Sequence, residues 1–190
     1  MKTKSSHLPL LLVISLVSIL ACACNEDGEI SGQLITNGDV ESGSGHPYGW
    51  WKNDGNGMYN VEWTDELSYS PKKSLKISTQ VADTSEFAIW GQTIPFNIPN
   101  GSAVRLNAKV KGNLSGDGAA IAMRGDNEEG SSEQFVTTQN SVLINGQFDW
   151  TEYHVKFDEV EAGTMEIHVF LIYLPNTTGE AYFDDISLTF

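Results

Sequence analysis

The sequence predicts an all-β protein whose short strands pack as an antiparallel sandwich. Runs of alternating apolar and polar residues recur from residue 34 to the end, which is the period of a half-buried strand. Turn-forming residues separate these runs at 53–55, 99–101, 116–118, 145–146 and 175–176. No segment shows the apolar spacing of an amphipathic helix, so strands and turns account for the whole domain.

The alternation also assigns a buried face to individual strands. Residues 104–111 place four apolar side chains on one face and four polar ones on the other. Residues 153–158 and 75–78 follow the same pattern. The segment 165–174 is apolar on both faces, which predicts a central strand covered on both sides. With no internal repeat, residues 34–190 are expected to form one domain.

The N-terminus has the pattern of a secretory signal. Two lysines precede an apolar run at 8–20, which is too short to span a bilayer, where about 20 apolar residues are needed. The run ends in ACAC, which places an alanine before Cys22 and another before Cys24. This ending resembles the lipobox of bacterial lipoproteins, in which the thiol is acylated. Residues 1–24 are therefore predicted to be a lipoprotein signal peptide, cleaved before Cys22 or Cys24.

The residues that follow favour an anchored, exported protein. The acidic stretch at 25–29 resembles the surface-export signal of Bacteroidetes lipoproteins, and 25–33 is polar enough to serve as a short tether. We therefore expect a cell-envelope protein, held by lipid alone in the outer membrane and exposed at the surface. An ordinary secretory signal with incidental cysteines is the alternative, and the choice between Cys22 and Cys24 stays open.

The composition disfavours one class of partner. The formal net charge is −14, and the chain has no basic stripe or cluster, so its surface repels phosphate backbones and nucleic acid is not expected to bind. Both cysteines lie at the predicted cleavage site, which leaves the folded part without a disulfide.

Three segments carry a family resemblance. The first is LITNGDVE at 34–41, followed by the tryptophan pair at 50–51; the second is YSPKKSLKI at 69–77; the third is AYFDDISL at 181–188. Their sequence, order and spacing resemble the galactose-binding-like jelly rolls of carbohydrate-binding module families 4, 9, 16 and 22. The resemblance extends over residues 34–190 and implies a β-sandwich jelly roll of two antiparallel sheets.

The resemblance also implies a structural calcium ion that joins the first and last strands. Carried over by position, Glu41 and Asp184 supply carboxylate oxygens, and backbone carbonyls near Tyr69 and Lys72 complete the shell. Calcium accepts such a mixture of six to eight hard oxygens. Asp185 replaces Asp184 if the strand register is shifted by one residue.

The aromatic residues suggest a carbohydrate site, because the C–H face of a pyranose packs against an aromatic ring. Alternation in the segment 87–93 places Trp90 and Gln92 on a face opposite Phe87 and Ile89, and we expect it to be solvent-exposed. In the resembling jelly rolls, strands at these positions line the binding sheet. The predicted carbohydrate-binding set is Trp90, Gln92, Arg124, Asp126 and Tyr173. Trp50 and Trp150 are predicted to pack, and Trp51 and Trp63 stay undecided.

Catalysis is not expected. The sequence contains no nucleophile elbow, no closely spaced histidine metal motif and no fixed pair of carboxylates. We predict non-catalytic binding of an oligosaccharide or polysaccharide, near glycoside hydrolases or transporters of the same system. The alternative is an accessory or assembly module of the same fold that contacts protein and has no glycan site.

Overall fold

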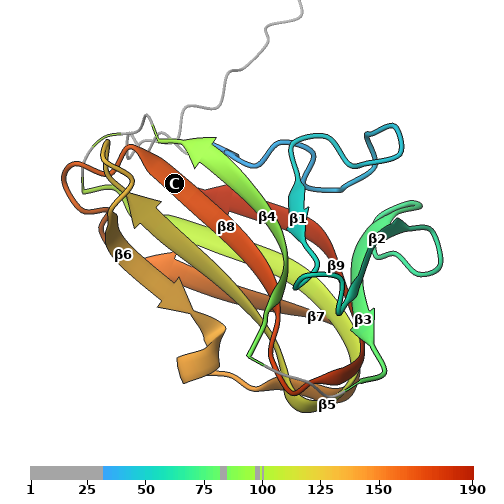
Figure 1. The fold of residues 1–190 in the computed structure, drawn as a ribbon. Helices are drawn as coiled ribbons and strands as arrows, with labels where there is room; N and C mark the ends of the chain where they lie inside the picture. Colours follow the sequence, from blue (N-terminus) through green and yellow to red (C-terminus); the bar gives the residue numbers. More distant parts are fainter. Residues whose placement is uncertain (1–31, 82–84, 97–98, 100) are drawn as a thin grey trace, which may run out of the picture. The chain divides into compact units, whose positions relative to one another are not determined.

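The computed structural model describes residues 32–81, 85–96, 99 and 101–190 (Figure 1). The predicted signal peptide, both cysteines and most of the predicted tether lie outside the described residues. No helix in the described part is long and apolar enough to cross a membrane.

The described residues form nine strands and one short 3₁₀ helix, which confirms the all-β prediction. Their bounds are β1 (Trp51–Asn53), β2 (Asn60–Thr64), β3 (Ser74–Thr79), β4 (Ala88–Pro95), β5 (Val104–Asp126), β6 (Ser132–Thr137), η1 (Thr138–Asn140), β7 (Ile144–Phe157), β8 (Glu166–Tyr173) and β9 (Thr178–Thr189).

One long strand, β5, belongs to both layers of the sandwich. Its first part, up to Ser115, pairs with β7 and β9, and its second part, from Ala119, pairs with β6 and β8. The chain turns between the two parts at Gly116 and Gly118, whose φ angles of 106° and 87° suit glycine. Strand pairing is antiparallel throughout, and the fold is a β-sandwich jelly roll.

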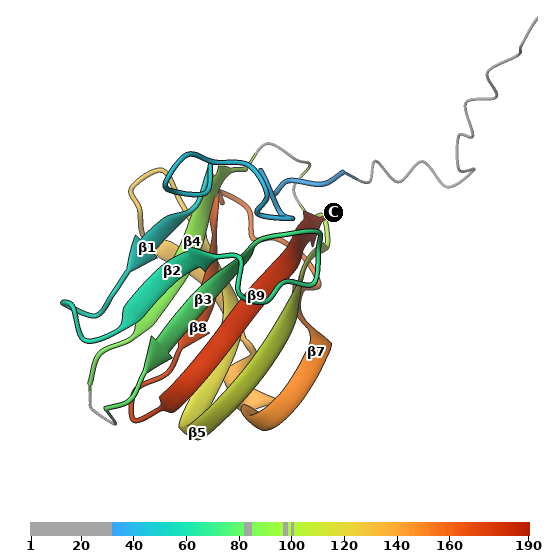
Figure 2. The same ribbon diagram turned by 90° about the vertical axis from the view of Figure 1, so that its right-hand side faces the viewer.

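Each layer is named here after its central strand. The β9 sheet has the order β2-β3-β9-β5-β7, with β3, β9 and β5 side by side in Figure 2. The β8 sheet has the order β1-β4-β8-β5-β6 (Figure 1). The predicted central strand at 165–174 is β8, which lies between β4 and β5 as expected.

The core lies between the two sheets and follows the predicted alternation. The apolar side chains at 104, 106, 108 and 110 are at most 1% exposed, and those at 75 and 77 are fully buried. Val155 and Phe157 of β7 are buried as well. Burying these side chains is the main favourable term for a domain without a disulfide.

The N-terminal segment of the domain lies beside the last strand, as the resemblance implied. The Leu34 N–H donates to the Leu188 carbonyl at 2.8 Å, and the Ile186 N–H donates to the Gly38 carbonyl at 2.8 Å. The segment is nevertheless a series of bends and not a regular strand, with a single bridge at Gln33.

Two tryptophans fix the bend in that segment. The Trp50 indole N–H donates to the Asn37 carbonyl at 3.0 Å, and the Trp63 indole N–H donates to the Val40 carbonyl at 2.7 Å. Both carbonyls belong to residues with positive φ, 54° and 49°. Trp50 is 2% exposed, so its predicted packing role is confirmed.

Candidate functional site

Three of the five predicted carbohydrate-binding side chains lie in the core and not on a surface. Trp90 is 1% exposed, Gln92 3% and Tyr173 0%. The indole N–H and the tyrosine hydroxyl each donate to a backbone carbonyl. The Gln92 amide bonds both the N–H and the carbonyl of Thr36, at 2.8 and 2.9 Å, and fastens the N-terminal segment to β4. These residues therefore have structural roles, and a sugar ring cannot stack on them.

The face assignment for β4 is wrong because alternation separates two faces without saying which one is inside. Both faces of this strand carry apolar residues. The indole of Trp90 fills space between the sheets, whereas Ile89 packs against a separate cluster and Thr93 is exposed. Phe87, just before the strand, is 42% exposed.

The other two predicted residues, Arg124 and Asp126, lie together on the outer face of the β8 sheet. Arg124 Nε is 2.8 Å from Asp126 Oδ1, and its terminal nitrogen is 2.7 Å from Oδ2. This two-pronged geometry is the strong form of a guanidinium–carboxylate pair. The carboxylate is 4% exposed, whereas the Arg124 side chain is 39% exposed. Arg124 thus offers N–H groups to solvent from a fixed position.

His168 joins this pair from the neighbouring strand β8. Its Nε2 is 3.1 Å from Asp126 Oδ2, and its Nδ1 is 3.0 Å from the Thr93 hydroxyl. Because a carboxylate oxygen accepts, Nε2 donates to Asp126, and the other ring nitrogen bonds the Thr93 hydroxyl. Both ring nitrogens are therefore occupied, which holds the ring in one orientation.

An aromatic pair lies next to these polar groups. The rings of Trp51 and Phe170 meet edge to face with centroids 6.0 Å apart, and Phe170 stacks on His168 at 6.1 Å. Arg124 lies 5.7 Å from the Phe170 ring centre. Trp51 is 37% exposed although its indole lies across the sheet over Gly91. A Cβ at Gly91 would stand 2.3 Å from that ring, so only glycine permits the placement.

An apolar cluster lies beside Phe170 of this pair. Ala120, Ala122, Ile172 and Leu174 form a second apolar cluster, separate from the main core, with Ile89 and Phe170 packed against it. Cross-strand pairing aligns Gly91 with both Trp51 and Phe170, and Arg124 with Phe135, which is 56% exposed. We call this surface the aromatic face, defined by Trp51, Ile89, Arg124, Phe135, His168 and Phe170.

The aromatic face combines the two elements that carbohydrate recognition needs. An exposed indole and a phenyl ring offer apolar contact to the C–H face of a pyranose. A fixed guanidinium beside them can bond ring hydroxyls without a large loss of side-chain entropy. Arg124 and Asp126 thus lie on an outer face with residues that the sequence prediction did not include, and apart from the other three predicted residues.

Trp51, His168 and Phe170 are the residues that the sequence prediction left out or undecided. One signal pointed to two of them: the alternate positions 168, 170 and 172 of β8 share the face opposite Ile167 and Val169. A histidine in an otherwise apolar strand marks the outer face of that strand. The pairing with Trp51 depends on β4 lying between the two strands, which no local pattern shows.

The residues predicted for calcium also come together. Asp184 is fully buried, whereas Asp185 is exposed, so the expected register is correct. Asp184 Oδ2 accepts the N–H groups of Tyr69 and Ser70 at 2.7 and 2.8 Å. Its Oδ1 accepts the Ser70 hydroxyl at 2.6 Å and the Asp185 N–H at 2.7 Å.

The Glu41 carboxylate also accepts backbone N–H groups of the loop between β2 and β3, which contains Tyr69 and Ser70 as well. Its Oε1 accepts the N–H groups of Lys72 and Lys73, both at 2.8 Å. These carboxylates thus bond backbone donors of the loop between β2 and β3, where calcium would require inward carbonyl oxygens. No cluster of three or more metal-ligating side chains occurs in the described residues. In this arrangement the cluster does not fit the calcium ion that the resemblance implied.

Comparison with known proteins gives the fold and no family. No protein-family model matches the chain, and no curated protein matches it. Solved structures do match. A Stig cyclase, Fisc from Fischerella sp. TAU, shares 15% identity with a TM-score of 0.62, and the match covers 84% of this chain and 97% of that chain. The enzymatically active domain of bacteriophage CBA120 tailspike protein 4 shares 13% identity over 82% of this chain, with a TM-score of 0.64. The match spans only 21% of that tailspike chain.

Two carbohydrate-binding modules have the same fold. TmCBM61, solved with β-1,4-galactotriose, shares 18% identity with a TM-score of 0.51, over 83% of this chain and 97% of that chain. The xylan-binding CBM22-1 domain of Xyn10C from Paenibacillus barcinonensis shares 13% identity with a TM-score of 0.53, over 83% and 94%. These matches confirm the jelly-roll fold. At such identities they carry no activity over, and the fold occurs in enzymes and binders alike.

Proposed function

We propose that this domain binds a glycan on the aromatic face and does not catalyse its cleavage. The observation that carries the proposal is the Trp51 indole, which lies exposed over Gly91, beside Phe170 and the anchored Arg124. Two modules of the same fold support it, one solved with β-1,4-galactotriose and one described as xylan-binding.

The alternative of catalysis has one observation in its favour. Thr93, His168 and Asp126 form a hydroxyl–imidazole–carboxylate chain, and two of the matching structures are enzymatic. However, both oxygens of Asp126 are already bonded by Arg124, and Oδ2 also bonds His168. Because its oxygens are already engaged by these two partners, the carboxylate holds Arg124 and His168 in place for binding.

The test is calorimetric titration of residues 25–190, which lack the predicted signal peptide and both cysteines, with β-1,4-galactotriose, soluble xylan and a panel of other oligosaccharides. Trp51→Ala should weaken binding at least about tenfold, since one stacked aromatic typically dominates such a site. Tyr48→Ala is the matched control, because Tyr48 is 60% exposed and lies outside the aromatic face. Equal affinities for wild type and Trp51→Ala would refute this site, and shortened products in the titrated sample would refute the non-catalytic role.

We also propose that the protein is lipid-anchored in the cell envelope, where it would hold polysaccharide near hydrolases or transporters. The support is the N-terminal apolar run and the ACAC ending. Replacing Cys22 and Cys24 together with serine should abolish acyl labelling and release the protein from membranes. Continued labelling of that variant would contradict the anchor.

A further inference from the structure

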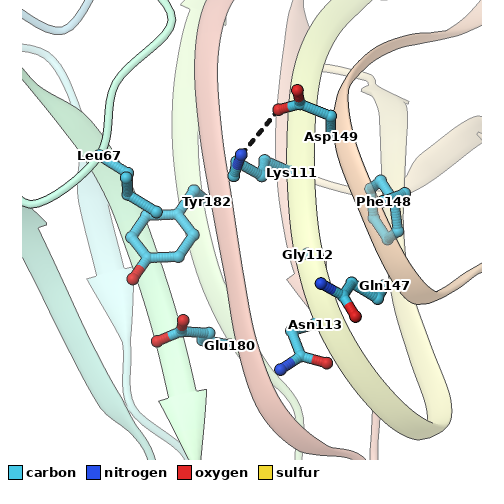
Figure 3. Close-up of a pocket in the computed structure, with 9 residues that line it drawn as sticks. All are labelled: Leu67, Lys111, Gly112, Asn113, Gln147, Phe148, Asp149, Glu180 and Tyr182. Carbon is cyan, nitrogen blue, oxygen red and sulfur yellow. Dashed lines mark hydrogen bonds and ion pairs between the residues drawn. The ribbon is translucent and has the colours of Figure 1, made fainter.

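A polar groove crosses the outer face of the β9 sheet, on the layer opposite the aromatic face. Its volume is about 560 Å³, which lies within the range of small-ligand sites. Strands β9, β5 and β7 line it with side chains that point into one opening (Figure 3). Those used in the argument are Lys111, Asn113, Gln147, Asp149, Glu180 and Tyr182.

Strand register arranges these side chains in two rows across the sheet. Tyr182 pairs with Lys111, whose ammonium reaches Asp149 on β7. One step along the strands, Glu180 pairs with Asn113, and Asn113 pairs with Gln147. Because antiparallel pairing fixes which side chains are neighbours, the rows are built into the sheet and do not depend on a loop.

The two amides are available to a ligand. Asn113 and Gln147 are both exposed, and within the described part of the chain neither side chain has a hydrogen-bond partner. An amide offers two N–H donors and a carbonyl acceptor. Adjacent sugar hydroxyls both donate and accept hydrogen bonds. They therefore match the two amides better than a ligand group such as a carboxylate, which only accepts.

The floor beside the amides is rigid. Tyr182 is 3% exposed, its hydroxyl is 3.2 Å from Glu66 Oε2, and the Lys76 ammonium lies 5.2 Å from its ring centre. Lys76 also pairs with Glu66 at 2.5 Å and with Glu180 at 3.3 Å. Burial raises the pKa of Tyr182 to about 12, so its hydroxyl stays protonated at neutral pH.

The charges of the groove favour a neutral ligand. Lys111 is the one cationic side chain among the described residues that line the groove, and its ammonium is paired with Asp149. Lys76, beside Tyr182, is likewise paired with Glu66 and Glu180. Neither cation is free to neutralise an acidic ligand, and the whole chain carries a formal net charge of −14. An anionic polymer would therefore be repelled.

An aromatic pair neighbours the groove in the chain, although its rings are not among the residues that line it. Tyr69, 51% exposed, meets Trp150 edge to face with ring centroids 6.0 Å apart. Trp150 directly follows Asp149, and the Tyr69 N–H is anchored to buried Asp184. A sugar bonded to the amides can extend toward this pair, where an exposed ring offers apolar contact.

We infer that the groove is a second binding site, for a neutral oligosaccharide, on the face opposite the aromatic face. The inference rests on the proposed glycan-binding function and deepens it, because a domain with a site on each outer face can hold two chains or two parts of one chain. Such bivalence raises the apparent affinity for a polymer above that for a short oligosaccharide.

The experiment is an amide chemical-shift titration of residues 25–190 with β-1,4-galactotriose, xylotriose and cellotriose, each compared with acidic trigalacturonate. At least one neutral trisaccharide should shift two separate groups of amides, around Trp51 and Phe170 and around Asn113 and Gln147. The double variant Asn113→Ala, Gln147→Ala should lower the affinity reported by the second group of amides at least tenfold and leave the affinity reported by the first group unchanged. Trp51→Ala should have the opposite effect. Asn60→Ala on β2 is the control, which should change neither affinity.

The outcomes separate the two proposals. Shifts confined to the aromatic face overturn the second site and leave the proposed function standing. Shifts confined to the groove overturn the proposed aromatic-face site, and no shift with any neutral probe overturns both. Stronger groove binding by trigalacturonate overturns the neutral-ligand assignment. If the double variant loses its native spectrum, Gln147→Ala alone, on the edge strand β7, provides the same comparison.

Discussion

The two outer faces of the sandwich differ in how they present side chains to solvent. On the β8 sheet, aromatic rings lie next to alanine and glycine residues. Beside them is a cluster of three polar side chains, those of Arg124, Asp126 and His168. On the β9 sheet, an ion network covers the strands, and Tyr182 is buried beneath it. Beside the network lie the amides of Asn113 and Gln147, which bond no other group among the described residues. One face therefore exposes aromatic rings, and the other exposes mainly polar side chains.

This difference arises from single positions on the strands. Gly91 lets the indole of Trp51 lie flat across β4, and the alanines of β5 leave room beside Phe170. In the first part of β5, the positions on the outer face carry lysine and asparagine, so polar side chains cover the surface there. The same strand therefore contributes a hydrophobic surface to one sheet and a hydrophilic surface to the other.

The largest expected effect is a loss of stability on removing Trp90, which lies between the two sheets, compared with Trp51, which lies on an outer face. Trp90→Ala should destabilise the domain by about 3 to 5 kcal/mol, because it leaves a cavity where a fully packed indole stood. Trp51→Ala should cost far less stability, since its ring is 37% exposed. Urea unfolding of the two variants measures both, and equal losses would show that Trp51 is part of the core.

The next largest effect concerns the loop that carries Tyr69. Asp184→Asn should destabilise the domain by about 2 to 4 kcal/mol, because an amide nitrogen would face N–H donors that now bond a buried carboxylate. Asp185→Asn is the matched control: Asp185 is exposed and has φ of 48°, a conformation that asparagine tolerates. Urea unfolding of both variants checks this, and similar losses would contradict the assignment of the buried role to Asp184.

A smaller effect tests how Trp51 is held. Gly91→Ala should displace the indole, because the new Cβ would lie 2.3 Å from its ring. We expect about a tenfold loss of glycan binding at the aromatic face, with unchanged binding in the groove. In a Trp51→Ala background the same substitution should have no further effect on binding, and a further loss there would show that Gly91 acts by another route.

The smallest expected effect is the response to metal. Because the oxygens of Glu41 and Asp184 already accept backbone N–H groups, a chelator should leave the melting temperature unchanged and added Ca²⁺ should not raise it. Differential scanning calorimetry in both conditions is the measurement. A calcium-dependent rise that is lost in Glu41→Ala would establish the metal site that the family resemblance implied.

Part of the architecture could be predicted from local patterns. The alternation at 104–111 identified the buried face of β5, and the apolar segment at 165–174 identified a central strand. Both predictions succeeded because a period of two in the sequence is a period of two on a strand. The resemblance at 34–41 and 181–188 likewise placed the two ends of the domain side by side.

The candidate site could be predicted only in part. Arg124 and Asp126 were found because two polar residues end an apolar run, and they do lie on an outer face. Trp90 and Gln92 were placed on the wrong face, because β4 is apolar on both sides and its alternation is symmetric. The pairing of Trp51 with Phe170 could not be foreseen, since more than a hundred positions separate them in the sequence.

The sequence by itself determined the secondary structure class, the jelly-roll fold and the strands that fill the core. The physical reason is that a strand with one buried face must place an apolar residue at every second position. Which aromatic rings face solvent was decided by the tertiary structure alone. That outcome depends on which strand lies beside which and on where a glycine permits close approach, as Gly91 does for Trp51. Contacts between distant segments, which no local pattern encodes, set both conditions.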